Sequence, residues 1–260
     1  ALPIYLAKAS PYKERAEIDR WILSKQQSLL ELVSQEMDNY YLYKTIHPML
    51  NFIDDLTNWY IRRSRRRFWK NAANQKEIDD KISAYATLYE VLVTLAKTLA
   101  PMMPFISEEL YQSLVVDVGM HKKLEDSIHL CDFVKPDISK IDKDLENEVD
   151  LVRQVVWMAR ALREKHRINT RQPLAKITVV THKPSELTAL IAHKELILSE
   201  LNVRDLVVLD DDEKLCSLSA KANYKTLGPR FSAQMKDAVA FINNLDAKNI
   251  KLLESGKNLV

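Results

Sequence analysis

The sequence predicts a mainly α-helical protein in which a helical bundle precedes a small α/β module. Apolar residues recur with the 3.6-residue period of a helix over four long segments in the first two thirds of the chain. Later runs of β-branched residues, such as Ile177–Val180, are typical of strands. Only 3 of the 260 residues are glycine, which disfavours glycine-rich phosphate loops and dinucleotide folds. We therefore expect a bundle over residues 1–172 and the module over residues 173–260.

After a leading segment with two prolines, the bundle is predicted to contain four long helices and a short one. Their apolar patterns cover residues 19–41, 46–70, 78–99, 107–114 and 145–162. In the second helix, the expected buried face consists of Ile46, Leu50, Ile53, Leu56 and Tyr60. Pro101 and Pro104 end or kink the third helix. Residues 116–144 are expected to be irregular, with a short extended piece at Ile128–Phe133.

The module is predicted from a change of pattern after residue 172. Strands are expected at Leu174–Val180 and Val203–Leu209, with a helix at Leu187–Leu198 between them. The run Asp210–Asp212 is expected to form a turn. Ala222–Thr226 is interpreted as a third short strand, followed by a helix over residues 232–243.

Composition limits the possible functions. The chain is 47% hydrophobic and 28% charged, as is usual for globular proteins, and its net charge is +2. Any affinity for nucleic acid must therefore come from local basic clusters. Cys131 and Cys216 lie far apart and form no CxxC pair, so we expect neither a zinc site nor a disulfide framework. No apolar run is long enough for a membrane span, and none resembles a signal peptide. The first residue is Ala, so we expect a processed chain or part of a longer one.

The most informative stretch begins at Asn58 and ends at Lys70. Six of the nine residues from Arg62 to Lys70 are cationic, and aromatic residues flank them. Guanidinium groups bind phosphates, and indole rings stack on unpaired bases. The candidate RNA-binding residues here are Trp59, Arg62, Arg63, Arg65, Arg66, Arg67, Trp69 and Lys70.

A plainer interpretation of this stretch is a solvated helix terminus, where cations are favoured in any case. Tyr60 falls on the apolar face and is expected in the core, whereas Trp59 lies one position off it and is a candidate for an exposed contact. The arginines cannot all share one face of a helix. Some should therefore be structural and pair with acids such as Asp54 or Asp55.

A second basic cluster lies at the end of the last bundle helix. It contains Arg160, Arg163, Lys165, His166, Arg167 and Arg171, with Glu164 as the single acid. A solvated helix end is again the alternative, but two such clusters on one bundle favour RNA binding. We take Arg163, Arg167 and Arg171 as further candidates for RNA contacts.

The sequence contains no pattern that predicts an active site. Its six histidines lack metal-ligand spacing, and acidic pairs such as Glu108-Glu109 are expected at helix starts or on the surface. Asp210–Asp212 lacks the glycine and the distal glutamate of a calcium loop. We therefore expect neither catalytic residues nor a bound metal in this chain.

Several segments resemble the C-terminal part of isoleucyl-tRNA synthetases, class I enzymes that attach isoleucine to tRNA. These segments are Asp19–Ser24, Leu56–Trp69, Leu99–Tyr111, Leu162–Arg163 with Ile168–Leu174, and Asn223–Phe231. The run Trp-Tyr-Ile-Arg-Arg-Ser-Arg-Arg-Arg-Phe-Trp is the most specific for this family. The run Ala-Pro-Met-Met-Pro-Phe is shared with the valine and leucine enzymes. The resemblance covers nearly the whole chain.

The resemblance implies an anticodon-binding helical bundle that holds the anticodon stem-loop of isoleucine tRNA. Because the His-Ile-Gly-His and Lys-Met-Ser-Lys-Ser signatures are missing, it implies a non-catalytic part of a ligase whose other domains use ATP and Mg²⁺. The implied partners are isoleucine tRNA and the rest of the synthetase chain. The resemblance also implies a monomer that lies in the cytoplasm and does not bind a membrane. The alternatives are a basic helical scaffold for protein interactions and the equivalent domain of valyl-tRNA synthetase.

Overall fold

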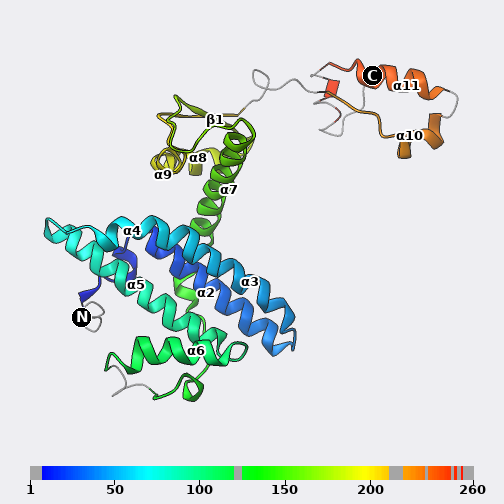
Figure 1. Ribbon diagram of the computed structural model, residues 1–260. Coiled ribbons are helices and arrows are strands. Elements are labelled where there is room, and N and C mark those ends of the chain that lie inside the picture. The colour runs from blue at the N-terminus through cyan, green and yellow to red at the C-terminus, as the bar shows by residue number, and fades with distance from the viewer. Residues whose placement is uncertain are drawn as a thin grey trace. The chain divides into compact units, whose positions relative to one another are not determined.

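The computed structural model describes residues 8–119, 125–210, 219–231, 234–246, 249–250 and 253. The chain divides into two compact units, Ala1–Leu151 and Val152–Val260. The division falls inside helix α7 (Lys143–Lys165), which is coloured green in Figure 1. The domain boundary predicted at residue 172 lies further along the chain, beyond α7, and stays a prediction.

The first unit is a bundle of long helices, as the apolar period predicts. Its main elements are α2 (Glu17–Asp38), α3 (Tyr43–Asp54), the π-helical η2 (Asp55–Ile61), α4 (Arg62–Trp69), α5 (Gln75–Leu99), α6 (Pro104–Tyr111) and the π-helical η3 (Gln112–Val116). Among the described residues, short 3₁₀ turns are formed by η1 (Tyr12–Glu14), η5 (Ile128–Leu130) and η6 (Ile138–Lys140). Helices α3, η2 and α4 follow one another without a break and pack with α2 and α5 (Figure 1). The mainly α-helical prediction is confirmed.

Local residues explain where two of these helices begin. Asn74 precedes α5, and its side chain accepts a hydrogen bond from the backbone N–H of Glu77 at 2.9 Å, as an N-cap does. The Glu77 carboxylate in turn accepts from the N–H of Ala73 at 2.8 Å. Helix α6 begins at Pro104, three residues before the predicted start at Ser107. A proline is favoured in the first helical turn because the N–H that it lacks would have no partner there.

The buried stripe of α3, η2 and α4 differs from the predicted one. Phe52, Leu56, Tyr60, Ser64 and Phe68 are buried at a constant spacing of four residues. In a regular α-helix of 3.6 residues per turn, such a stripe drifts by about 40° per step. The π-helical turn η2 holds more residues per turn and offsets this drift.

The altered helical phase also explains a wrong prediction. Ile46 and Leu50 were expected on the buried face with Ile53, but both are exposed. Met49 and Phe52 are buried in their place. The predicted face assumes a constant α-helical period from Ile46 to Tyr60, and the π-helical turn breaks that period.

The irregular segment after η3 is tied to α6 by polar contacts. The Glu108 carboxylate accepts from the N–H of Ile128 at 2.9 Å and from Ser127 Oγ at 3.0 Å. The Tyr111 hydroxyl donates to the carbonyl of Glu125 at 2.9 Å. These contacts fix a 3₁₀ turn at Ile128–Leu130, so the extended piece predicted at Ile128–Phe133 is wrong for its first three residues.

The second unit contains the α/β module. Its further elements are β1 (Ile177–Val180), α8 (Pro184–Ala192), α9 (Lys194–Leu201), β2 (Leu206–Leu209), α10 (Tyr224–Phe231) and α11 (Met235–Asn243). The two strands pair in parallel, with Ile177 opposite Leu206 and Val180 opposite Leu209. Parallel strands need a long crossover, which α8 and α9 provide. The two predicted strands are therefore confirmed.

Two details of the module differ from the predictions. The single helix predicted at Leu187–Leu198 is instead two helices that meet at His193. The third strand predicted at Ala222–Thr226 is wrong, because helix α10 begins at Tyr224. The Asn223 side chain accepts from the backbone N–H of Lys225 at 3.1 Å, a local bond that is typical of helix starts and turns. In the turn predicted at Asp210–Asp212, the last two residues lie outside the described residues, as do residues 232–233 of the last predicted helix.

Candidate nucleic-acid interface

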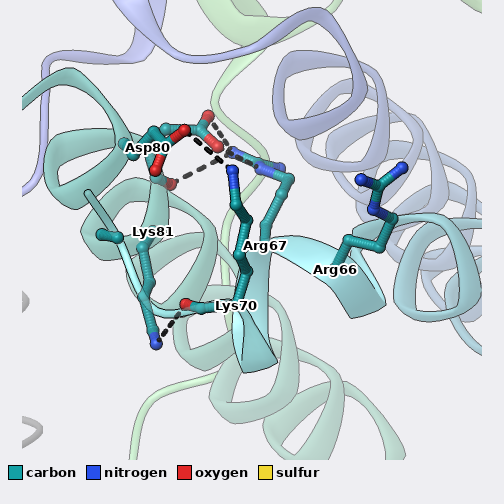
Figure 2. Close-up of a pocket in the computed structure, with 7 residues that line it drawn as sticks. Arg66, Arg67, Lys70, Asp80 and Lys81 are labelled. Atoms are coloured by element: carbon teal, nitrogen blue, oxygen red, sulfur yellow. Dashed lines mark hydrogen bonds and ion pairs between the residues drawn. The ribbon is translucent and has the colours of Figure 1, made fainter. Parts of the chain in front are cut away.

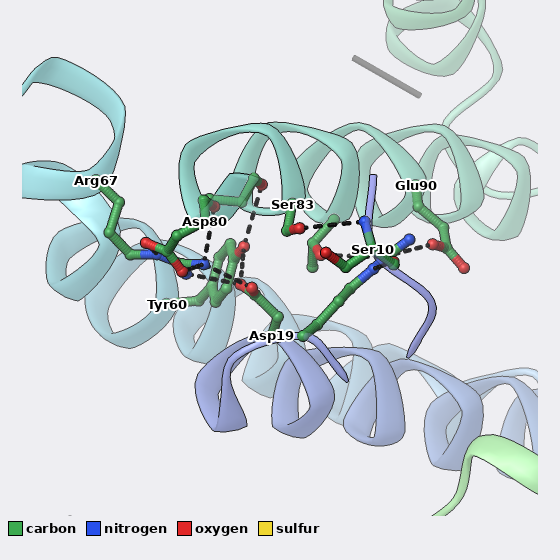
Figure 3. Close-up of polar contacts among 10 residues, drawn as sticks. Ser10, Asp19, Tyr60, Arg67, Asp80, Ser83 and Glu90 are labelled. Atoms are coloured by element: carbon green, nitrogen blue, oxygen red, sulfur yellow. Dashed lines mark hydrogen bonds and ion pairs between the residues drawn. The ribbon is translucent and has the colours of Figure 1, made fainter. Parts of the chain in front are cut away.

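The basic stretch of α4 is anchored to the bundle by Arg67. Its guanidinium donates to both carboxylate oxygens of Asp19, at 2.8 and 2.7 Å, and to both of Asp80, at 2.8 and 2.7 Å. Asp19 is fully buried near the start of α2, and Asp80 lies on α5. Arg67 therefore links three helices, and Figure 3 shows it beside both carboxylates.

Tyr60 completes this buried network. Its hydroxyl donates to Asp19 Oδ1 at 2.7 Å (Figure 3), and its side chain is fully buried. Burial and the negative charge of Asp19 raise the pKa of Tyr60 well above its usual value. Burial alone would lower the pKa of Arg67, but its hydrogen bonds to Asp19 and Asp80 outweigh this effect and raise it. The core position predicted for Tyr60 is confirmed.

The acid partners of Arg67 differ from those that the sequence suggested. Asp54 and Asp55 were expected to pair with the arginines of this stretch, because they lie a turn or two upstream. For Arg67 this prediction is wrong, whereas for the other arginines it stays a prediction. Asp55 lies 3.7 Å from Lys25 of α2, and Asp54 accepts a hydrogen bond from the Asn58 amide. Asp19 and Asp80 lie 48 and 13 positions from Arg67 in the sequence, so helical spacing could not identify them.

Trp59 is buried, with only 6% of its surface exposed, so the expectation of an exposed contact is wrong. The side chains of Arg62 and Arg63 lie over its ring at 5.6 and 5.5 Å from the centroid. The π-helical turn brings both Trp59 and Tyr60 to the interior. Trp59 is therefore a packing residue that holds two arginines by cation–π contact.

Trp69 is the exposed aromatic residue of this stretch. It is 70% exposed, and Arg65 lies over its ring at 5.5 Å from the centroid. Arg65 and Arg66 are both exposed, and within the described residues neither guanidinium has a hydrogen-bonded or ion-paired partner. These three side chains form a surface that can take phosphate oxygens and a planar ring.

A pocket of about 180 Å³ lies where the end of α4 meets α5. Its charged lining residues are Arg66, Arg67, Lys70, Glu77, Asp80 and Lys81, a surplus of two positive charges. Lys70 pairs with Glu77 at 2.9 Å, and Lys81 donates to the carbonyl of Lys70 at 3.2 Å. In Figure 2, Arg67 reaches Asp80, whereas Arg66 points away from that carboxylate.

Lys81 is not among the residues that the sequence predicts to bind RNA. It lies outside the basic stretch, on the apolar-patterned helix α5, and only the packing of α4 against α5 brings it to the pocket. Each of the two elements carries cations toward the pocket, so an anion there would meet charges from both. No pattern within a single helix could have revealed this arrangement.

The second basic cluster, at the end of α7, has one buried member. Arg163 is 5% exposed and donates to the carbonyls of Asn169, Gln172 and Leu201, at 3.0, 3.0 and 2.8 Å. It therefore joins the end of α7 to the following loop and to the end of α9. This role is structural and leaves the guanidinium little capacity for RNA.

The other members of the second cluster are more accessible. Arg160 pairs with Glu200 at 2.7 Å, while Arg167 and Arg171 are exposed. The two clusters belong to different units, α4 to the first and the end of α7 to the second. Among the described residues, His, Cys, Asp and Glu side chains form no group of three that could bind a metal, and no helix has the length and apolarity to cross a bilayer.

The sequence that forms these elements matches a known family of domains. The family model for the anticodon-binding domain of tRNA ligase matches residues 19–179, which is more than half of the chain. The chain therefore belongs to this family of anticodon-binding domains, in agreement with the resemblance seen in its sequence.

Three curated relatives of this chain are all isoleucine–tRNA ligases. The chain is 38% identical to the isoleucine–tRNA ligase of Chlamydia caviae and 39% identical to that of Chlamydia abortus, each over 238 residues. It is 38% identical over 229 residues to the isoleucine–tRNA ligase of Chlamydia pneumoniae. The first two alignments cover 92% of this chain but 22% of each relative. The chain thus spans about a fifth of the length of these relatives.

Proposed function

We propose that this chain binds the anticodon stem-loop of isoleucine tRNA and thereby supports the attachment of isoleucine by a larger ligase. The observation that carries the proposal is the set of exposed cations on α4, held in place by the ion pair between Arg67 and the buried Asp19. Arginine and lysine side chains neutralise phosphates, which supplies most of the sequence-independent affinity for RNA. The match to an anticodon-binding family supports the choice of RNA.

The proposed contacts divide by chemistry. Arg62, Arg63, Arg65, Arg66 and Lys70 would bind phosphates, with Lys81 as an additional member, and Trp69 would stack on a base. Arg167 and Arg171 are proposed as further phosphate contacts from the second unit. Trp59, Arg67 and Arg163 are assigned to the scaffold, because they are buried or their polar groups are already engaged.

The activity of the whole ligase and the place of this chain in it are also proposals. The chain alone is expected to carry out neither ATP activation nor aminoacylation, which would use ATP and Mg²⁺ in other domains of the ligase. We propose a cytoplasmic monomer whose bundle orients the tRNA. Residues 1–172 would be the anticodon-binding domain, and residues 173–260 a separate module.

A salt titration tests the proposal. The chain is titrated with an anticodon stem-loop hairpin of isoleucine tRNA over a range of salt concentrations, as wild type and as Arg65→Ala/Arg66→Ala. For each arginine that contacts phosphate, the slope of log affinity against log salt should fall by about 1, and affinity should weaken for all RNA sequences. The matched control is Lys135→Ala/Arg204→Ala, which removes the same charge from exposed positions elsewhere.

The outcome separates RNA binding from the alternatives. If the control double variant changes the salt slope as much as the α4 variant, the effect comes from net charge and the α4 surface is not the site. If the wild-type chain has no affinity for the hairpin even at low salt, RNA binding is refuted and a protein-interaction scaffold becomes the better account.

A further inference from the structure

The turn between α2 and α3 carries three tyrosines in four residues, which we call the aromatic tip: Tyr40, Tyr41 and Tyr43. Tyr40 and Tyr43 are 91% and 72% exposed, and Tyr41 is about half exposed. Tyr43 begins α3, and Trp69 ends α4 on the same continuous helix. At 1.5 Å per residue, this helix separates Tyr43 from Trp69 by about 40 Å. Figure 1 shows the turn at the end of α2 and α3 that is remote from α4.

Tyr40 has a backbone conformation that does not suit its side chain. Its φ is 61°, in the left-handed region that glycine or asparagine usually occupies after a helix. A bulky residue with such a φ carries a free-energy cost. Because its ring is almost fully exposed, packing in this unit does not offset that cost. Strain without burial indicates a ring kept for an external contact.

The aromatic tip is ordered by its own contacts. The Lys44 ammonium lies 4.0 Å from the centroid of the Tyr41 ring and pairs with Glu36 at 3.2 Å. The rings of Tyr41 and Tyr43 meet edge to face, with centroids 6.2 Å apart. The backbone N–H of Tyr41 donates to the carbonyl of Glu36 at 2.8 Å. A platform that is fixed in advance loses little entropy on binding.

We propose that the aromatic tip stacks on unpaired bases of an RNA loop. The proposal rests on the proposed function and assigns base contacts to a surface outside the basic stretch. Exposed rings beside a cation are the elements of a stacking platform, since every base has a flat face and a nearby backbone phosphate. The first unit thus presents phosphate-binding cations and the Trp69 ring at one end, and the aromatic tip at the other. An elongated ligand with both features is an RNA hairpin, whose loop bases are splayed from the stem.

The test uses an anticodon stem-loop hairpin that carries 2-aminopurine in its loop, with the blunt duplex of the same stem as a second ligand. Tyr40→Ala and Tyr43→Ala should each weaken hairpin binding by about 5- to 150-fold if the ring stacks on a base. Each should also reduce the change in 2-aminopurine fluorescence, while affinity for the duplex and the salt slope stay as in wild type. Tyr40→Phe and Tyr43→Phe keep the ring and should keep the affinity.

Two controls separate stacking from damage to the fold. Tyr224→Ala removes an exposed tyrosine from α10 and should leave hairpin binding unchanged. Tyr40→Gly should raise the Tm, because glycine accepts the positive φ, and should nevertheless weaken hairpin binding. A variant that binds less while its fold becomes more stable has lost a contact.

Each outcome bears on one proposal. If the tyrosine variants bind the hairpin as tightly as wild type while Arg65→Ala/Arg66→Ala binds weakly, the aromatic tip is not a base platform and RNA binding through α4 stands. If the tyrosine variants lose affinity for hairpin and duplex equally, the tip does not distinguish unpaired bases and the inference fails. If the wild-type chain binds neither ligand, the proposed function itself is refuted.

Discussion

The partly buried Arg67 and the buried Arg163 both lie inside basic clusters, but they are stabilised by different partners. Arg67 lies between two carboxylates, Asp19 and Asp80, which balance its charge. Arg163 donates to backbone carbonyls of Asn169, Gln172 and Leu201, which supply dipoles and no net charge. One arginine therefore depends on the ionisation of other side chains, whereas the other depends on backbone geometry. A run of cations in a sequence thus conceals at least two structural roles besides ligand binding.

The largest effect on stability should come from removing Arg67 from its ion pairs with Asp19 and Asp80. Arg67→Ala would leave the buried Asp19 carboxylate without its cation and should lower the free energy of unfolding by about 3–5 kcal/mol. Urea unfolding followed by circular dichroism measures this loss. Arg66→Ala, one position away and exposed, is the matched control and should change stability by less than about 0.5 kcal/mol. Equal effects of the two variants would contradict the structural role of Arg67.

A smaller loss of stability is expected at Arg163, whose partners are uncharged backbone carbonyls. Arg163→Ala removes charge-assisted hydrogen bonds to carbonyls and should lower the free energy of unfolding by about 1.5–3 kcal/mol. Lys165→Ala, an exposed change in the same helical turn, is its control. Protease resistance of residues 166–174 should fall in Arg163→Ala alone, since this loop loses its tether. A stable variant with an unaltered cleavage pattern would refute the carbonyl contacts.

The smallest effect is expected at Tyr60, whose titration makes the stability of the Arg67 network, but not of the Arg163 contacts, depend on pH. Because burial and Asp19 raise the pKa of Tyr60, the unfolded chain loses this proton near pH 10, while the folded chain retains it to higher pH. The unfolded state then binds fewer protons, so stability falls as the pH rises above about 10. Tyr60→Phe should cost about 1 kcal/mol at pH 7 and flatten this decline by up to about 1.4 kcal/mol per pH unit. The measurement is the urea midpoint of unfolding for wild type and Tyr60→Phe between about pH 8 and pH 11, a range that brackets the ordinary tyrosine pKa. If Tyr60 did not contribute, the two midpoints would change with pH in parallel.

The helical period predicted most of the bundle, because long amphipathic helices carry a repeated signal. It located α2, α5 and α7 and the two paired strands within a few residues. It failed where the period itself changes, at η2, because Ile46 and Leu50 of the preceding α3 are exposed. It also failed at Ala222–Thr226, where short apolar runs fit a strand or a helix equally well.

The candidate site was less predictable than the fold. The cationic character of the surface on α4 follows from the sequence, but its division into exposed and buried members does not. Asp19 and Asp80 are remote in sequence from Arg67, and Lys81 belongs to another helix. Such contacts depend on how helices pack. The aromatic tip was likewise not predicted, because the apolar helical pattern extends to residue 41, whereas α2 ends at Asp38 and Tyr40 is exposed in the following turn.

The π-helical turn sets the orientation of α4 relative to α3, because a π-helix advances by fewer degrees per residue than an α-helix. If the seven residues of η2 were wound as a regular α-helix, every side chain of α4 would rotate by roughly 100° relative to α3. Arg66 would then take the direction of Arg67 toward Asp19, and Arg67 would take the direction of the buried Phe68. The π-helical turn thus corrects the rotational phase of the helix. It lets a helix with a four-residue apolar repeat keep its charged anchor inward and its neighbouring cations outward over its whole length.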